Sequence, residues 1–135
     1  MKTAAKLVLP VVVGAMAGMA MIQLAERLLQ LKYPLPPGLS LRDAVAAMPV
    51  SAFAFLLLGY SVASLCAGLV ATMVSGRENI RPAIIVGIII TSGGVFNNIS
   101  VPGQPQWFSI ISLLAYLPFA MLGYLLVRKR DAQGD

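Results

Sequence analysis

Four long blocks of apolar residues, separated by short polar stretches, dominate the pattern along this chain. A helix rises about 1.5 Å per residue, so about 20 apolar residues cross a hydrocarbon core roughly 30 Å thick. No Lys, Arg, Asp or Glu interrupts any of the blocks. The pattern predicts an all-α, integral membrane four-helix bundle that forms one domain over residues 1–135, with spans at about 7–25, 50–74, 83–101 and 107–127.

The connections between the blocks predict how the helices are arranged. The second and third, "SGRENIR" and "GQPQ", are short and require antiparallel neighbours. The first, "LKYPLPPGLSLRDAVAAMP", is rich in proline, which favours an extended segment. Within it, Ser40 and Asp43 are spaced like a capping box, so we expect a short interfacial helix from Leu41 to Met48. Pro118, in the middle of the fourth block, is expected to bend that helix.

Charge changes the picture by giving the bundle an orientation. The chain is 59% hydrophobic and carries a net charge of +5, but its basic residues lie at block ends and not on one polar face, which argues against nucleic-acid binding. The positive-inside bias then predicts cytoplasmic termini in a bacterial inner membrane. Seven basic residues lie on the predicted inner side and three on the outer side: Lys2, Lys6, Arg77, Arg81, Arg128, Lys129 and Arg130 against Arg27, Lys32 and Arg42.

A cleaved signal peptide is the alternative interpretation of the first block. Small residues at Ala15 and Ala17 suit a peptidase, but the apolar run continues to Leu24 and is long enough to span. The single cysteine, Cys66, lies deep in the second block, where a buried and inert thiol is expected.

Small residues recur at four-residue spacing, as they do where membrane helices approach closely. Two interpretations are open: packing between helices of the same chain, or a face for a second copy or another membrane protein. The candidate packing residues are Gly14 and Gly18 in the first block, Gly59, Ala63 and Ala67 in the second, and Gly93 and Gly94 in the third.

Strongly polar residues near the membrane gather at one level, the predicted outer third. They form a candidate polar pocket of Gln23, Glu26, Asn97, Asn98 and Trp107. One interpretation is that the amides hydrogen-bond across helices, with Glu26 satisfied by Arg27 or interfacial water. The other is an outward-facing cavity for a cation or a small polar head group, with Trp107 and Tyr33 at its rim.

Catalytic chemistry is not indicated. The chain has no histidine, and its sequence contains no phosphate loop, metal-ligand cluster or nucleophile beside a base. We therefore predict no enzyme activity, no cofactor and no metal. Two functions compete: an accessory or assembly subunit that binds a membrane protein through its small-residue ridges, and a small oligomeric transporter or channel for a cation or polar solute. The polar groups reach only the outer third, which argues against an ion path within one protomer.

Two motifs carry a resemblance. They are the proline-rich "YPLPPG" in the first connection and "PQWF" before the last block. In both, and over most of its length, the chain resembles a group of uncharacterised small four-helix bacterial inner-membrane proteins. That group often has a histidine in the second motif, where this chain has Gln104 and Gln106. The resemblance implies the same fold and location and brings no known activity.

Overall fold

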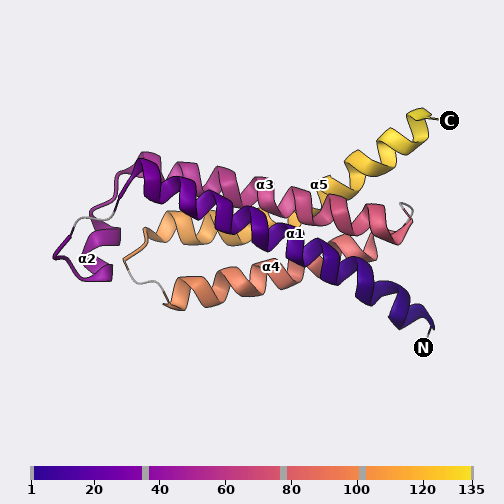
Figure 1. Ribbon diagram of the computed structural model, residues 1–135, viewed down its shortest axis with the longest axis horizontal. Coiled ribbons are helices and arrows are strands. Elements are labelled where there is room, and N and C mark those ends of the chain that lie inside the picture. The colour runs from indigo at the N-terminus through magenta and orange to yellow at the C-terminus, as the bar shows by residue number, and fades with distance from the viewer. Residues whose placement is uncertain (1, 35–36, 77–78, 101–102, 135) are drawn as a thin grey trace.

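Four long helices packed side by side make up the structure, a computed structural model that describes residues 2–34, 37–76, 79–100 and 103–134 (Figure 1). The long helices are α1 (Lys2–Lys32), α3 (Val50–Ser75), α4 (Arg81–Ser100) and α5 (Gln106–Gly134), and a short helix, α2 (Leu41–Ala46), lies between α1 and α3. The described residues form no strand. The predicted all-α bundle of four long apolar helices is therefore confirmed.

Each long helix contains a stretch that is long and apolar enough to cross a membrane: Leu7–Lys32, Val50–Ser75, Arg81–Ser100 and Gln106–Arg128. The last three lie within two residues of the predicted spans, and Val101, the predicted end of the third, is outside the described residues. The first stretch ends at Lys32 and not at Ala25. The predicted span ends before the first charged residue, but Glu, Arg, Leu and Gln all favour helix, so α1 continues to Lys32. It ends there because Pro34 disfavours the helical conformation at Tyr33, the residue before it. Glu26 thus lies inside α1 and not at its outer end.

Helix α3 is the centre of the bundle: α3 and α4 each contact the other three long helices, but the contacts of α3 with α1 and α5 are the most extensive. Its small residues permit close approach on two sides. A β-carbon added at Gly14 of α1 would lie 2.7 Å from the backbone oxygen of Ala67, and one added at Gly68 would collide with the backbone of Ala120 in α5. Ala67 is completely buried. At Gly14, Ala67 and Gly68 the small-residue ridges are thus occupied by helices of the same chain.

The remaining small residues behave differently from one another. Gly18 lies against Ala67 and Ile90, and Gly59 lies against Ala25. The ring of Tyr116 covers Gly94, whereas Gly93 faces open space. Ala63 is buried within the bundle.

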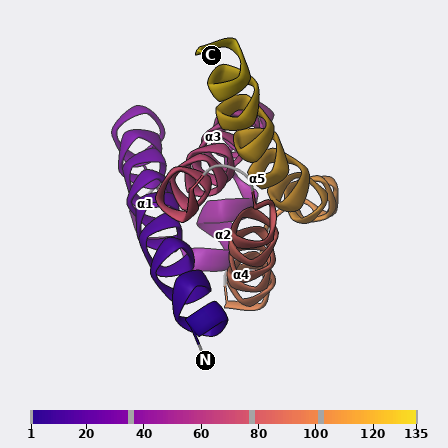
Figure 2. The same ribbon diagram turned by 90° about the vertical axis from the view of Figure 1, so that its right-hand side faces the viewer.

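The two connections at one end of the bundle meet each other. We call this the α2 end, and both chain termini lie at the opposite end (Figure 1). The Ser40 side chain accepts a 3.2 Å hydrogen bond from the backbone N–H of Asp43, as the capping pattern predicted, although α2 ends at Ala46 and not at Met48. Gly103 has a positive φ of 93° and packs against the backbone of Arg42 in α2. Viewed along the bundle, α2 lies across the space between the long helices (Figure 2).

Helix α5 passes through Pro118 without a break in its assigned helix. Its C-terminal part leads away from the other helices in Figure 1. Four aromatic residues connect α3 and α5 near the α2 end. The Phe53 and Phe108 rings are 5.3 Å apart, and the Tyr60 ring lies 6.2 Å from those of both Phe108 and Tyr116.

Gly68→Ala and Gly93→Ala form a matched pair that tests the close approach of α3 to α5. The added methyl at position 68 has no room beside Ala120, so we expect a loss of about 1–3 kcal/mol in the free energy of unfolding. At position 93 the methyl enters open space and should be neutral, or stabilising by up to about 1 kcal/mol through helix propensity. Thermal unfolding in detergent micelles measures both. Equal unfolding midpoints for the two variants would contradict this packing.

Candidate functional site

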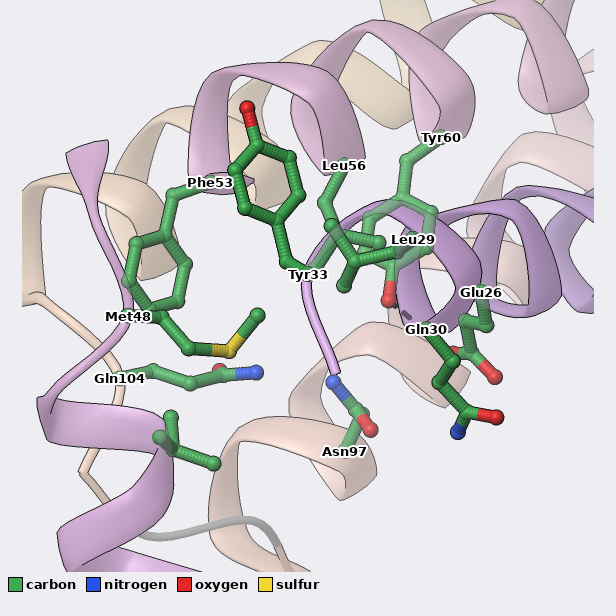
Figure 3. A pocket seen from close by; sticks show the side chains of 11 residues that line it. Glu26, Leu29, Gln30, Tyr33, Met48, Phe53, Leu56, Tyr60, Asn97 and Gln104 are labelled. Atoms are coloured by element: carbon green, nitrogen blue, oxygen red, sulfur yellow. Dashed lines mark hydrogen bonds between the residues drawn. The ribbon is translucent and has the colours of Figure 1, made fainter. Parts of the chain in front are cut away.

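A pocket of about 220 Å³ lies at the α2 end of the bundle (Figure 3). Its walls come from α1, α3 and α4, and residues of α2 and of the two connections close it. Five of its lining residues are apolar and six are polar: Leu29, Val45, Met48, Phe53 and Leu56, and Glu26, Gln30, Tyr33, Tyr60, Asn97 and Gln104.

Helical periodicity explains why the end of α1 and the residue directly after it contribute four of these residues. Glu26, Leu29, Gln30 and Tyr33 are spaced by three and four positions, so they follow one face of the chain at the end of α1. Phe53, Leu56 and Tyr60 repeat the same spacing on α3 and form the facing wall. The pocket therefore lies between one face of α1 and the facing side of α3 at the α2 end.

A hydrogen bond between α1 and α3 fixes the carboxylate. The Tyr60 hydroxyl donates to Oε1 of Glu26 at 3.1 Å. Tyr60 is only 5% exposed and is held between the rings of Phe108 and Tyr116, whereas Glu26 is half-buried. This bond uses one carboxylate oxygen of Glu26, Oε1, and does not involve the other. One of the two sequence interpretations had Glu26 satisfied by Arg27 or by interfacial water; in the structure Tyr60 donates a hydrogen bond to it.

Amide groups face the carboxylate from the other side of the pocket. In the view of Figure 3 the Gln104 and Glu26 side chains lie on opposite sides, with Asn97 between them. The Gln104 side-chain oxygen is buried, and no group of the described residues donates a hydrogen bond to it. A buried carbonyl oxygen without a donor costs about 1–3 kcal/mol, so this position favours a ligand or a water that can donate.

Tyr33 lines the pocket directly after the end of α1. Its hydroxyl donates to Ser51 Oγ at 3.0 Å, which connects the end of α1 to the start of α3. The Lys32 ammonium lies 5.6 Å from the centre of the Tyr33 ring, within range of a cation–π contact. One positive charge is therefore held beside the pocket but outside its lining.

Of the five predicted pocket residues, the structure brings together only Glu26 and Asn97. Gln23 lies about 60° around α1 from Glu26, on the side away from the buried Ala25 and Leu29, and it is exposed. Asn98 is half-buried but does not line the pocket. Trp107 packs edge-on against Phe108 with ring centres 6.2 Å apart and is 39% exposed, so it lies outside the cavity.

Sequence reasoning missed Tyr60, Gln30 and Gln104. Tyr60 could have been predicted from the sequence, because a phenol inside an apolar span needs a hydrogen-bond partner and Glu26 lies close to the end of the preceding span. Gln30 was placed outside the first helix, since the span was ended too early. Gln104 lies in a connection, where no periodicity indicates its direction.

Metal chemistry finds no support in the part of the chain that the structure describes, which contains no group of three His, Cys, Asp or Glu residues able to hold an ion. The described residues define a class of protein: an all-helical bundle with four helices that could span a membrane and a mixed polar and apolar pocket at the α2 end. No protein-family model, curated protein or solved structure matches this chain.

A double-mutant cycle with Tyr60→Phe and Glu26→Ala measures the hydrogen bond that fixes the carboxylate. We expect a coupling free energy of about 1 kcal/mol, because interhelical hydrogen bonds in membrane proteins contribute about 0.6–2 kcal/mol. Unfolding midpoints in detergent micelles supply the four values. Tyr33→Phe with Glu26→Ala is the matched control, and its coupling should be near zero because Tyr33 donates to Ser51. Equal coupling in both cycles would contradict the Tyr60 assignment.

Proposed function

We propose that this chain is an integral protein of a bacterial inner membrane that binds a small polar or cationic molecule at its extracytoplasmic side, as an accessory or partner-binding subunit. The carrying observation is the pocket around Glu26, which opens at one end of a bundle whose other half is densely packed. The resemblance to small inner-membrane proteins supports the choice of membrane.

Insertion in a membrane is supported by the surface of the helices. Large apolar side chains point outward along all four of them, and such a surface suits lipid and not water. The most exposed examples on each helix include Leu31 of α1, Val50 of α3, Ile99 of α4 and Leu114 of α5.

The orientation rests on charge. Six of the nine basic residues that the structure describes belong to the helix segments at the end of the bundle that holds the termini, and the positive-inside bias favours the cytoplasm for that end. Arg81 and Arg128 are exposed there, whereas the side chains of Lys2, Lys6, Arg77, Lys129 and Arg130 lie outside the described residues. This orientation turns the α2 end, and with it the pocket, to the extracytoplasmic side.

A binding role fits the interior better than a self-contained channel does. Beyond the pocket, toward the termini, the centre of the bundle is filled by Ala63, Ala67, Ala71 and Val86, each completely buried. The completely buried hydroxyls of α3 in this region are those of Ser64 and Thr72, and Thr72 donates to the Gly68 carbonyl oxygen of its own helix at 2.7 Å. No continuous polar route therefore leaves the pocket within this part of the chain.

A small oligomeric transporter is the second candidate. Glu26 favours it, since a carboxylate within a membrane-spanning stretch often marks a transport pathway, and it is the only Asp or Glu in the four stretches that could span. A pathway of this kind would have to run between protomers.

Cysteine labelling tests the outward-facing pocket. Single cysteines replace Gln30 and Asn97, which line the pocket, and Asn79, which is exposed between α3 and α4, all in a Cys66→Ala background. In intact cells we expect a membrane-impermeant thiol reagent to label positions 30 and 97. Position 79 should label only after permeabilisation.

Two results would overturn the proposal. Labelling of position 79 alone in intact cells would reverse the orientation. A failure of positions 30 and 97 to label in both intact and permeabilised cells would show that the pocket is closed to solvent. A fourth single cysteine at Leu114, which the proposal places in lipid, is the matched negative control.

A further inference from the structure

The lining of the pocket contains both donors and acceptors, among them three side-chain amides, but Glu26 is its one charged group. An ionised carboxylate accepts about four hydrogen bonds, and Glu26 receives one, from Tyr60. The buried Gln104 oxygen accepts none from the described residues. No Lys or Arg is among the eleven residues that line the pocket. The pocket lining therefore gives the Glu26 carboxylate no countercharge, which a positively charged donor would supply.

We propose that the pocket binds the primary ammonium group of a small amine, with Glu26 as the counterion. This inference rests on the proposed binding function and specifies its ligand. An ammonium supplies three N–H donors and the charge that a half-buried carboxylate lacks. The rings of Tyr33, Phe53 and Tyr60 line the same space, and aromatic faces attract cations.

A metal cation fits these residues less well. Calcium takes six to eight oxygen ligands and magnesium requires near-octahedral oxygen coordination. The pocket offers one carboxylate, and its walls include Leu29, Met48, Phe53 and Leu56, which supply no oxygen. Those apolar walls instead suit the carbon chain of an amine. An anion is disfavoured because Glu26 would repel it.

The size of the pocket limits the ligand. Sites for drug-sized molecules typically measure about 300–1,000 Å³, and this pocket measures about 220 Å³. A short free amine would fit, and so would the ammonium end of an aminophospholipid head group. Lys32, held at the Tyr33 ring, would repel a second cation and attract the phosphate of such a lipid. The shared chemistry is the primary ammonium, and the experiment separates its sources.

The test uses the full chain purified in maltoside micelles and titrated calorimetrically with three probes that share a butyl chain. n-Butylamine carries the charge and the N–H donors, n-butanol lacks the charge, and butyltrimethylammonium has the charge without donors. We expect saturable binding of n-butylamine, at least tenfold weaker binding of n-butanol, and weaker binding of butyltrimethylammonium. Equal affinity for n-butylamine and n-butanol would overturn the proposal without relying on any variant.

Variants locate the binding site. Glu26→Gln keeps the shape of the side chain and an oxygen for Tyr60 but removes the charge, so it should weaken n-butylamine binding at least tenfold. Glu26→Asp keeps the charge and should recover part of the affinity. Asp43→Asn removes an exposed carboxylate outside the pocket and should change nothing. Undiminished binding by a folded Glu26→Gln protein would overturn the assignment.

A lipid comparison identifies the source. Nanodiscs containing phosphatidylethanolamine or phosphatidylcholine differ in N–H donors but not in net charge. If phosphatidylethanolamine blocks n-butylamine binding and phosphatidylcholine does not, the ammonium comes from a lipid. If neither blocks it, the ligand is a free amine. Labelling of positions 30 and 97 from outside, combined with no amine binding, would refute the ammonium assignment and leave the outward pocket standing.

Discussion

The close approach of α3 to its neighbours is the constraint on which the rest of the structure depends. Gly14 and Gly18 of α1 lie against the Ala67 region of α3, and Gly68 lies against Ala120 of α5. In lipid, burying apolar surface between helices gains little over leaving it in contact with acyl chains, so dense packing and interhelical hydrogen bonds must hold the helices together. Small residues permit that density, and they place α3 in the centre of the bundle.

The pocket exists because the small residues end before the helices do. Between α1 and α3 they extend from Gly14 to the contact of Ala25 with Gly59. Toward the α2 end the facing positions are occupied by Leu29, Tyr33, Phe53 and Leu56. Larger side chains hold the helices apart, and the space between them is closed by α2 and the α4–α5 connection. The increase in side-chain size along α1 and α3 thus explains why the bundle is densely packed toward the termini and contains a pocket at the α2 end.

Glu26 takes its chemical character from its position at that boundary. It follows Ala25, which touches Gly59, and its hydrogen-bond donor, Tyr60, follows Gly59. The dense contact on one side holds the pair in register, while the pocket on the other side leaves part of the carboxylate open. A half-buried carboxylate retained in this way is costly unless a cation or further donors complete it. The half-buried negative charge of Glu26 thus lies beside a space that is large enough for a ligand.

The sequence by itself determined the four helices, most of their ends, the Ser40 cap of α2 and the presence of Glu26 and Asn97 at one end of the bundle. These follow from local rules: the length of apolar blocks, helix capping and the order of charges along the chain. Only the tertiary structure decided that Tyr60 and Gln104 join the pocket, that Gln23 and Trp107 do not, and that the small-residue ridges are used within the chain. Those outcomes depend on how each helix is rotated about its own axis, and apolar spans with residues of similar character on every face carry little information about that rotation.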